Sequence, residues 1–414
     1  MGYGHEGDRA RRSAAEELVG ALSQGRISRR QFLQRAAALG LSMSAVGALL
    51  AACGGSSSTA TSPVASASAA GLSLGMPDYG DQFKGEKMVT TCWSGPYAKD
   101  WIDVMVPEFE SITGAKVEVI PSWIEIPTKI KAAPADNPPY DCTIGDGSVY
   151  WTAISDKLWL PIRTENVPNL KDIFPALMAQ TPAKSGYGVP FDGAYAAILN
   201  AQGVDPPVKL WADFWRSDLK QALSLDVNFY YSIYAGVFAL GLDPRQALTD
   251  KAMIDQVFAK MADLSPNVLK WYESGGELYG LLERGELKAG YYYSDTLVGK
   301  QSKQLGLTGY IPTDGQIGYI DYYFVVRGTK HRDLAEAFIN YIISPKKNQE
   351  WLNTHWSSPA NSQVKIPPGT PPELAALVAV TNEQWAAWHD YDWDIFFKNW
   401  DYWNNRWKTE VLGQ

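Results

Sequence analysis

The sequence predicts an α/β protein of two domains, preceded by an export segment and a flexible linker. Three observations support this class. A strand, a helix and a second strand follow one another with short joints between residues 88 and 120, which favours parallel strands with a covering helix. A second series of helical and strand-like segments begins after residue 210. The folded part, about 335 residues, is longer than one ordinary hydrophobic core supports.

The first 52 residues have the pattern of an exported lipoprotein. A twin-arginine pattern, SRRQFL with Arg29 and Arg30, precedes an uncharged run of about 17 residues at 36–52. Leu-Ala-Ala stands before Cys53, as in a bacterial lipobox, so we expect cleavage before Cys53 and lipid on its sulfur. The alternative is an uncleaved membrane helix. The run is short and weakly apolar for a span that needs about 20 residues.

Charge restricts what the exported part binds. Residues 1–52 carry seven arginines against four acids, and the whole chain has a formal net charge of −8, so residues 53–414 carry about −11. An acidic chain argues against nucleic acid and is compatible with a cationic ligand. Residues 54–75, rich in Gly, Ser, Thr and Ala, form a linker that reaches on the order of 25 Å.

Simple patterns predict the first elements of the folded part. Residues 88–93 (MVTTCW) are β-rich, and residues 98–112 carry apolar side chains at helical spacing. Pro107 interrupts this helix and kinks it, and Gly114 fits its C-terminal cap. Two further strands follow, at residues 116–120 and 140–145.

A long extended segment, residues 187–200, crosses to the second series of elements. Helical patterns then occupy residues 210–217, 230–240, 251–261, 276–284 and 334–343. Residues 288–294 and 319–327 are β-rich. The helix at 334–343 is amphipathic and stops at Ser344-Pro345.

The C-terminal tail is rich in tryptophan. At 100° per residue a single stripe contains Trp385, Trp388, Phe396, Trp400, Trp403 and Trp407. Such a stripe indicates a helix docked on the body of the protein, and an exposed contact for a partner is the alternative.

Two cysteines remain after Cys53. Cys92 and Cys142 lie in strands that we expect to be neighbours. Outside the cytoplasm they could form a disulfide, although buried free thiols are also common in such sheets.

Several stretches, in order, resemble the bacterial spermidine/putrescine-binding proteins of ABC importers. They are VTTCWSGPY, FESITGAKVEVIPSW, YDCTIG, VPNLKDIF, YGVPF, LSPNVLKWYESGGELYGLLERGELKAGYYYSD, the turn at 319–321, and AFINYIISPKKNQEW. Together they span most of residues 88–361. The resemblance implies a two-lobed, periplasmic-binding-protein-like fold of type II, α/β in class, with the ligand in the cleft between the lobes.

The resemblance also implies a division of the chain. Residues 1–52 are the signal peptide, and residues 53–80 are the lipidated cysteine and linker. Lobe I comprises residues 81–192 plus about 291–327. Lobe II comprises about 196–288 plus 328–414, including the Trp-rich C-terminal helix.

A cleft that holds an amine has recognisable chemistry. An ammonium group offers three donors and no acceptor, so its site needs carboxylates and other oxygens. Its methylene chain needs an apolar wall, and Trp or Tyr faces supply one together with cation–π attraction of roughly 0.5–2 kcal/mol. Aromatic faces with separated carboxylates therefore suit a diamine or polyamine.

The first candidate residues follow the early strands. Trp93 and Tyr97 match an aromatic pair of the resembled family; Trp93 as the end of a buried strand is the alternative. Asp146 follows the third strand, where the family often has Ser. A carboxylate there faces the cleft or caps the next helix.

Further candidates come from the second half of the resemblance. Tyr292 would replace the family's stacking Trp, and Asp295 would keep its amine-binding acid. Tyr319 and Asp321 resemble the family's Trp-x-Asp turn.

Two more acids are candidates with specific alternatives. Asp226 matches the first acid of the family's acidic pair, and the second is replaced by Phe229 or Tyr230, which weakens one clamp for an amine. An ordinary helix cap is the alternative role for Asp226. Asp192 lies in the crossing segment, near a position where the family favours an aromatic residue.

Other functions fit less well. Tyr291, Tyr292 and Tyr293 are reminiscent of paired tyrosinates that bind ferric iron, but the chain has only four histidines. The sixteen tryptophans would suit sugar capture. A secreted hydrolase would use two carboxylates as acid and base, but the aligned acids are better explained as amine partners and no His-Glu-x-x-His pattern occurs, so we predict no catalytic residues.

We therefore expect the substrate-binding subunit of an ABC importer for polyamines or related organic cations. Its expected partners are the small-molecule cation, a membrane permease and the lipid anchor at Cys53, without nucleic acid, cofactor or metal. We expect a monomer on the outer face of the cytoplasmic membrane or in the periplasm.

Overall fold

The computed structural model describes residues 69, 71–122 and 124–414. The expected signal peptide with Arg29 and Arg30, the lipidation site Cys53 and most of the linker lie outside the described residues. Residues 65–414 group into one compact unit. Within the described part of the chain, no helix combines the length and apolar character that a membrane span requires.

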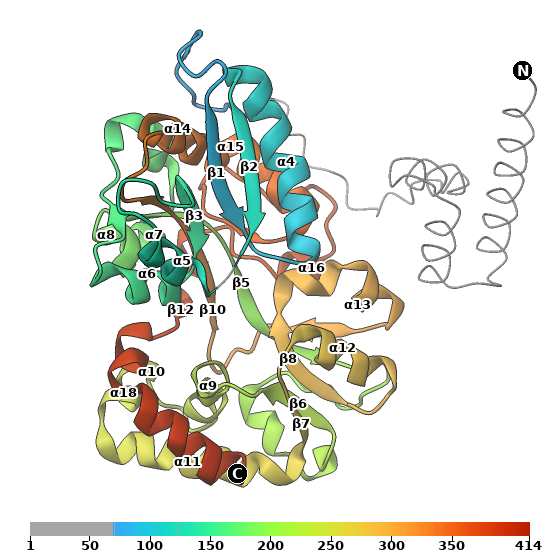
Figure 1. Ribbon diagram of the computed structural model, residues 1–414. Helices are drawn as coiled ribbons and strands as arrows, with labels where there is room; N and C mark the ends of the chain where they lie inside the picture. The colour runs from blue at the N-terminus through green and yellow to red at the C-terminus, as the bar shows by residue number, and fades with distance from the viewer. Residues whose placement is uncertain (1–68, 70, 123) are drawn as a thin grey trace, which may run out of the picture. The chain divides into compact units, whose positions relative to one another are not determined.

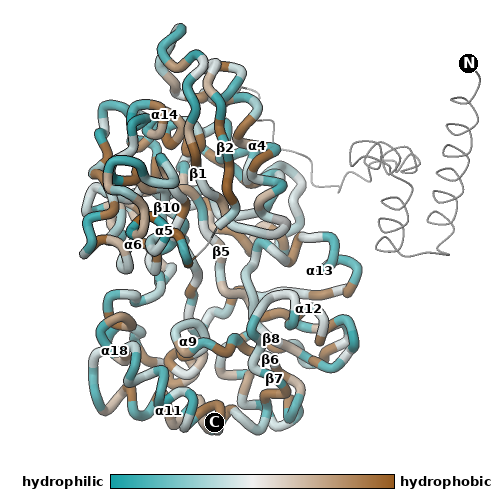
Figure 2. The backbone as a smooth tube through the Cα atoms, in the orientation of Figure 1, coloured by the Kyte–Doolittle hydropathy of each residue, from teal (hydrophilic) through white to brown (hydrophobic). Residues whose placement is uncertain are grey.

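The predicted strand–helix–strand unit is present. Strands β1 (Lys87–Cys92) and β2 (Lys116–Pro121) pair in parallel and are joined by helix α4 (Pro96–Thr113) (Figure 1). Pro107 lies inside α4, and Gly114 ends it in the left-handed conformation with φ 69°. Hydrophobic segments run along β1 and β2 in Figure 2. The buried face of α4 includes Trp101, Met105 and Phe109.

The third predicted strand pairs differently. Strand β3 (Cys142–Gly145) is antiparallel to β10 (Ile317–Val326), from far along the chain, so the expectation of parallel neighbours holds for β1 and β2 alone. Cys92 and Cys142 are both buried and both free. The Cys142 sulfur lies 3.3 Å from the Thr90 hydroxyl.

Two long strands carry the chain across the molecule. Strand β5 (Gly188–Asn200) is buried throughout and pairs antiparallel with β10 over its first half. Its second half pairs with β8 (Ala289–Tyr293) and β9 (Thr308–Tyr310). In Figure 1 β5 and β10 pass between the group around β1 and the group around β8.

The other elements complete the two groups. The short strands are β4 (Trp159–Leu160), β6 (Leu223–Asp226), β7 (Val268–Tyr272) and β11 (Ser358–Pro359). The helices are α5 (Ile126–Ala132), α6 (Gly147–Ile154), α7 (Pro175–Met178), α8 (Thr181–Lys184), α9 (Phe229–Ala239), α10 (Pro244–Thr249), α11 (Lys251–Leu264), α12 (Gly275–Glu283), α13 (Lys300–Gln304), α14 (Arg332–Ile342), α15 (Pro345–His355) and α16 (Pro372–Ala375).

Residues 210–217 do not form the predicted α-helix. They form a 3₁₀ turn, Trp211–Trp215, and a second one begins at Ser217. The carboxylate of Asp314 accepts hydrogen bonds from the backbone N–H groups of Trp211 and Ala212, at 3.1 and 3.0 Å. This long-range contact stabilises the start of the turn, and it cannot be predicted from the local sequence pattern.

Two hydrophobic cores lie on either side of the crossing strands. The first contains Trp101 of α4 and Phe324 of β10, and the second contains Leu225 of β6 and Phe258 of α11. Phe338 of α14 and Trp351 of α15 pack in the first core, although the expected division gave residues 328–414 to the second lobe. Tyr291 and Ile317, expected in lobe I, pack in the second core.

The Trp-rich C-terminal segment is two helices rather than one. Helix α17 (Asn382–Ala387) is followed by β12 (His389–Asp390), which pairs in parallel with β10, and then by α18 (Trp393–Arg406). The stripe is interrupted because Trp385 and Trp388 pack with the first core, whereas the second core receives Phe396, Trp403 and Trp407. The prediction that these rings dock on the body is confirmed for these five.

Candidate ligand-binding site

A cavity of about 330 Å³ lies where the crossing strands meet the ends of β1, β3 and β8. The structure brings seven of the nine predicted ligand-binding residues to its wall: Trp93, Tyr97, Asp146, Tyr292, Asp295, Tyr319 and Asp321. Residues that the sequence did not single out complete the lining, namely Ser94, Tyr231, Tyr293, Thr296 and His355. The two predicted residues that do not line it are Asp192 and Asp226.

Asp146 has both of the roles that the sequence left open. It is the N-cap of α6 and accepts hydrogen bonds from the backbone N–H groups of Ser148 and Val149 at 2.9 and 3.3 Å. It also lines the cavity. Burial raises the pKa of its carboxyl, and these hydrogen bonds oppose that rise because they favour the ionised form.

Asp321, which lines the cavity, and Asp192, which does not, form a buried carboxyl pair. They are register partners on β5 and β10, and both are 0% exposed. Asp321 Oδ2 accepts from Trp93 Nε1 at 2.6 Å, and Asp192 Oδ2 accepts from Trp351 Nε1 at 2.6 Å. Among the described residues, the Oδ1 atom of each carboxyl has no hydrogen-bond partner.

The buried pair strongly resists ionisation. Burial raises the pKa of Asp192 to about 6, and burial together with the charge of Asp192 raises the pKa of Asp321 well above its usual value. Two neighbouring carboxyl groups in a dry site cannot both carry charge without a cation nearby. A ligand ammonium beside Asp321 would supply that cation.

Asp295 lies at another part of the wall, in the turn after β8. Its Oδ2 accepts from the Tyr319 hydroxyl at 3.1 Å and lies 3.4 Å from His355 Nε2. Burial alone would lower the pKa of His355, but Asp100 and Asp295 outweigh this and raise it to about 9. No local pattern in the sequence marks His355, because its position depends on how α15 docks.

Aromatic rings form much of the remaining wall. Tyr293 meets Tyr319 edge to face, with ring centroids 4.8 Å apart and planes at 81°. Tyr97 is buried, and its ring packs edge-on against His355 with centroids 4.8 Å apart. Tyr faces attract cations and also cover methylene groups. The cavity therefore combines the two kinds of surface that an organic amine needs.

The structure places Asp226 away from this wall. Its Oδ1 accepts from the backbone N–H of Asn228 at 2.8 Å and from the Asn228 amide at 2.9 Å. Burial raises its pKa to about 6. These contacts are those of a turn-stabilising carboxylate just before α9.

The tyrosine run at the end of β8 is not arranged as a tyrosinate cluster. Tyr292 and Tyr293 line the cavity, whereas Tyr291 packs in the second core. Burial raises the pKa of Tyr292 to about 12 and that of Tyr293 well above its usual value, which favours protonated phenols. Across the described residues, no group of three or more His, Cys, Asp or Glu side chains is placed to hold a metal ion.

Comparison with known proteins gives a consistent result. The family model for bacterial extracellular solute-binding proteins matches residues 105–382. Over 140 residues the chain is 27% identical to a gamma-aminobutyric acid-binding protein of Pseudomonas aeruginosa. Over 170 residues it is 25% identical to a spermidine/putrescine-binding periplasmic protein of Salmonella typhimurium. These matches cover 33% and 41% of this chain and 39% and 48% of the relatives, less than half of either curated protein.

Solved structures share the fold over most of the described chain. The spermidine/putrescine transporter substrate-binding protein PotD of Streptococcus pneumoniae superposes with a TM-score of 0.65 at 19% identity, covering 78% of this chain and all of that one. The Atu4243-GABA receptor gives 0.63 at 16% identity, covering 79% of this chain and 98% of that one. The fold is thus the two-lobed type II fold of periplasmic binding proteins, and the chain belongs to the family of bacterial extracellular solute-binding proteins.

Proposed function

We propose that this protein captures an organic amine, a polyamine or a related organic cation, outside the cytoplasmic membrane and delivers it to the permease of an ABC importer. The observation that carries the proposal is the carboxyl pair of Asp192 and Asp321 beside an aromatic cavity. Each of these acids keeps one oxygen without a hydrogen-bond partner among the described residues. A buried carboxyl with an open oxygen is costly, and an ammonium group would relieve that cost.

Closure of the two lobes around the solute is the mechanism that fits this site. Trp93 and Tyr97 follow β1, on the side of the first core, whereas Tyr292 belongs to β8, on the side of the second. A solute that touches both sides favours the closed arrangement over the open one. Bending of β5, β10 and β12, which link the two cores, would accompany this closure.

The export route and anchor belong to the same proposal. The twin-arginine pattern and the lipobox at Cys53 support passage through the membrane in the folded state and attachment by lipid. Labelling with a radioactive fatty acid tests the anchor: the natural chain should incorporate label, and the Cys53→Ala variant should not. Equal incorporation by both would contradict lipidation at Cys53.

The names of two relatives fix the choice of test ligands. Polyamines and gamma-aminobutyric acid both carry an ammonium group on a short carbon chain. Calorimetric titration of the full chain with putrescine, spermidine, spermine and gamma-aminobutyric acid should give binding by at least one of them. Maltose and ferric citrate serve as controls for the sugar and iron alternatives. Binding of a control in the absence of any amine binding would overturn the proposal.

Hydrolysis is not favoured by the same residues. Asp192 and Asp321 are register partners on adjacent strands, and Asp321 alone of the two lines the cavity, so the pair does not flank the cavity as an acid and a base would.

A further inference from the structure

An ion pair joins the two sides of the cavity at His355 and Asp295. His355 is the last residue of α15, whose Trp351 belongs to the first core. Asp295 follows β8, whose Tyr291 belongs to the second core. His355 Nε2 lies 3.4 Å from Asp295 Oδ2, and both residues line the cavity. A fixed cation of the protein is therefore already present in a site whose other charged groups are acids.

The imidazole ring is held in place from several sides. It stacks on Trp351 with ring centroids 4.5 Å apart and planes at 13°, and the edge of Tyr97 meets it. Its Nδ1 lies 3.5 Å from Asp100 Oδ2, on α4, so each ring nitrogen faces a carboxylate. Carboxylates at both nitrogens favour the doubly protonated, positively charged ring. The side chain is only 15% exposed, so water screens this charge weakly.

The two acidic parts of the cavity are consequently unequal. At Asp295, Oδ2 already has the Tyr319 hydroxyl and the His355 ring as partners. Asp295 Oδ1 is open, but an ammonium bound there would lie next to the imidazolium and be repelled by it. At Asp321 the donor is the neutral indole of Trp93, and the neighbouring Asp192 adds negative character. An ammonium is therefore favoured at Asp321 and opposed at Asp295.

We infer that His355 is a specificity-determining residue, which takes the position of a second ammonium and makes the cavity select a solute with a single ammonium group. The inference rests on the proposed function, within whose class of organic cations it chooses. It reverses one expectation from the sequence, where Asp295 was the acid retained for amine binding. In this site Asp295 serves the protein's own cation.

The test compares solutes that share a four-carbon chain. Butylamine and gamma-aminobutyric acid carry one ammonium group, and putrescine carries two. Calorimetry on the full chain should give at least tenfold tighter binding of one of the single-ammonium compounds than of putrescine. In the His355→Gln variant the ratio of putrescine affinity to butylamine affinity should rise at least tenfold. His331→Gln is the matched control, because His331 pairs with Glu86 away from the cavity.

A double-mutant cycle separates the ion pair from a general effect of the substitution. Asp295→Asn alone should not raise putrescine affinity relative to butylamine affinity, because the His355 cation remains in place. In the His355→Gln background, Asp295→Asn should remove the gain in putrescine affinity. Thermal unfolding of each variant establishes that it is folded. The preference of the natural chain for a single-ammonium compound over putrescine is a test that needs no variant.

Distinct results would contradict the inference and the proposed function. If the natural chain binds putrescine more than tenfold tighter than both single-ammonium compounds, His355 does not exclude a second ammonium, and amine capture stands. If a folded His355→Gln variant has the same ratio of putrescine affinity to butylamine affinity as the natural chain, His355 likewise does not exclude a second ammonium. If none of the amines, spermidine and spermine included, binds at millimolar concentration, the proposed function fails and this inference fails with it.

Discussion

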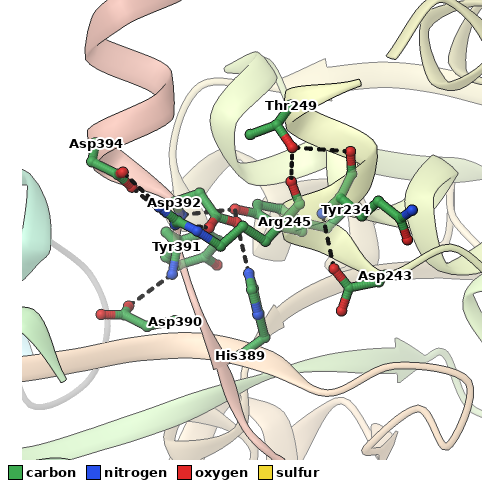
Figure 3. Close-up of polar contacts among 10 residues, drawn as sticks. Tyr234, Asp243, Arg245, Thr249, His389, Asp390, Tyr391, Asp392 and Asp394 are labelled. Atoms are coloured by element: carbon green, nitrogen blue, oxygen red, sulfur yellow. Dashed lines mark hydrogen bonds and ion pairs between the residues drawn. The ribbon is translucent and has the colours of Figure 1, made fainter. Parts of the chain in front are cut away.

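Two cavities of about 330 Å³ each differ in how their acids are paired. One is the aromatic cavity described above. The other lies beside β12, between α10 and the start of α18, and contains Arg245, His389, Asp392 and Asp394 (Figure 3). The two cavities therefore do not differ in volume, but they differ in how their acidic side chains are paired.

The acids beside β12 have partners within the protein. Asp392 Oδ1 lies 3.0 Å from Arg245 Nη1, and its Oδ2 accepts from the Tyr234 hydroxyl at 2.9 Å and lies 2.6 Å from His389 Nε2. Asp394 pairs with the same arginine at 2.8 Å. Asp390 is the exception, and burial raises its pKa well above its usual value, which favours its neutral form.

Under the proposed function, the two neighbouring buried carboxyls without an ion pair, rather than the size of the hollow, distinguish the aromatic cavity from the one beside β12. Beside β12 the charges are compensated and hold the segment that links the two cores. At the aromatic cavity neither Asp192 nor Asp321 forms an ion pair within the described part of the chain, and a ligand ammonium can provide one.

The largest effect on amine affinity is expected at Asp321. Asp321→Asn keeps the size of the side chain and removes its charge. A hydrogen bond to a charged group contributes about 1.5–3 kcal/mol, so affinity for the tightest amine should fall by roughly ten- to 150-fold. Calorimetry measures the change. If the folded variant binds the amine with unaltered affinity, Asp321 does not bind the ammonium. The proposed difference between the two cavities would then be wrong.

The second prediction is a dependence on pH. The pKa of Asp192 is raised to about 6 and that of Asp321 is raised well above its usual value, so acid converts both to neutral groups that hold an ammonium poorly. Amine affinity should therefore decrease as pH falls below about 6, by up to about tenfold per unit, and binding should release protons. Titration at several pH values, in buffers of different ionisation enthalpy, measures both quantities. Constant affinity from pH 5 to 7 without proton release would contradict the unpaired state of these acids.

The smallest effect on affinity is expected beside β12. Asp392→Asn leaves Arg245 and His389 without their shared carboxylate, and should lower the free energy of unfolding by about 1–3 kcal/mol. Amine affinity should change less than threefold. Denaturant unfolding and calorimetry on the same preparation measure the two quantities. A loss of affinity as large as that of Asp321→Asn would mean that the two cavities do not have separate roles.

Much of the fold and of the site could be predicted because the signals are local. The apolar spacing of residues 98–112 and the cap at Gly114 predicted α4, which the structure confirms. Trp93 and Asp146 follow strands, at positions where side chains of an α/β sheet meet the cleft. The residue that follows a predicted strand can be identified from the sequence alone.

The rest depended on contacts between distant segments. His355 reaches the cavity because α15 packs against α4, and no local pattern records that docking. The interruption at β12 follows from pairing with β10, more than sixty residues earlier. Asp226, although it is the last residue of β6, accepts hydrogen bonds from Asn228 and does not line the cavity.

The most direct test is a crystal structure of the protein with the amine that binds it most tightly. We expect the ammonium nitrogen within hydrogen-bond distance of Asp321 in the aromatic cavity, with the carbon chain against Tyr292 or Tyr319, and the cavity beside β12 unoccupied by ligand. An amine bound beside β12 at Asp390, with the aromatic cavity lacking one, would contradict the account.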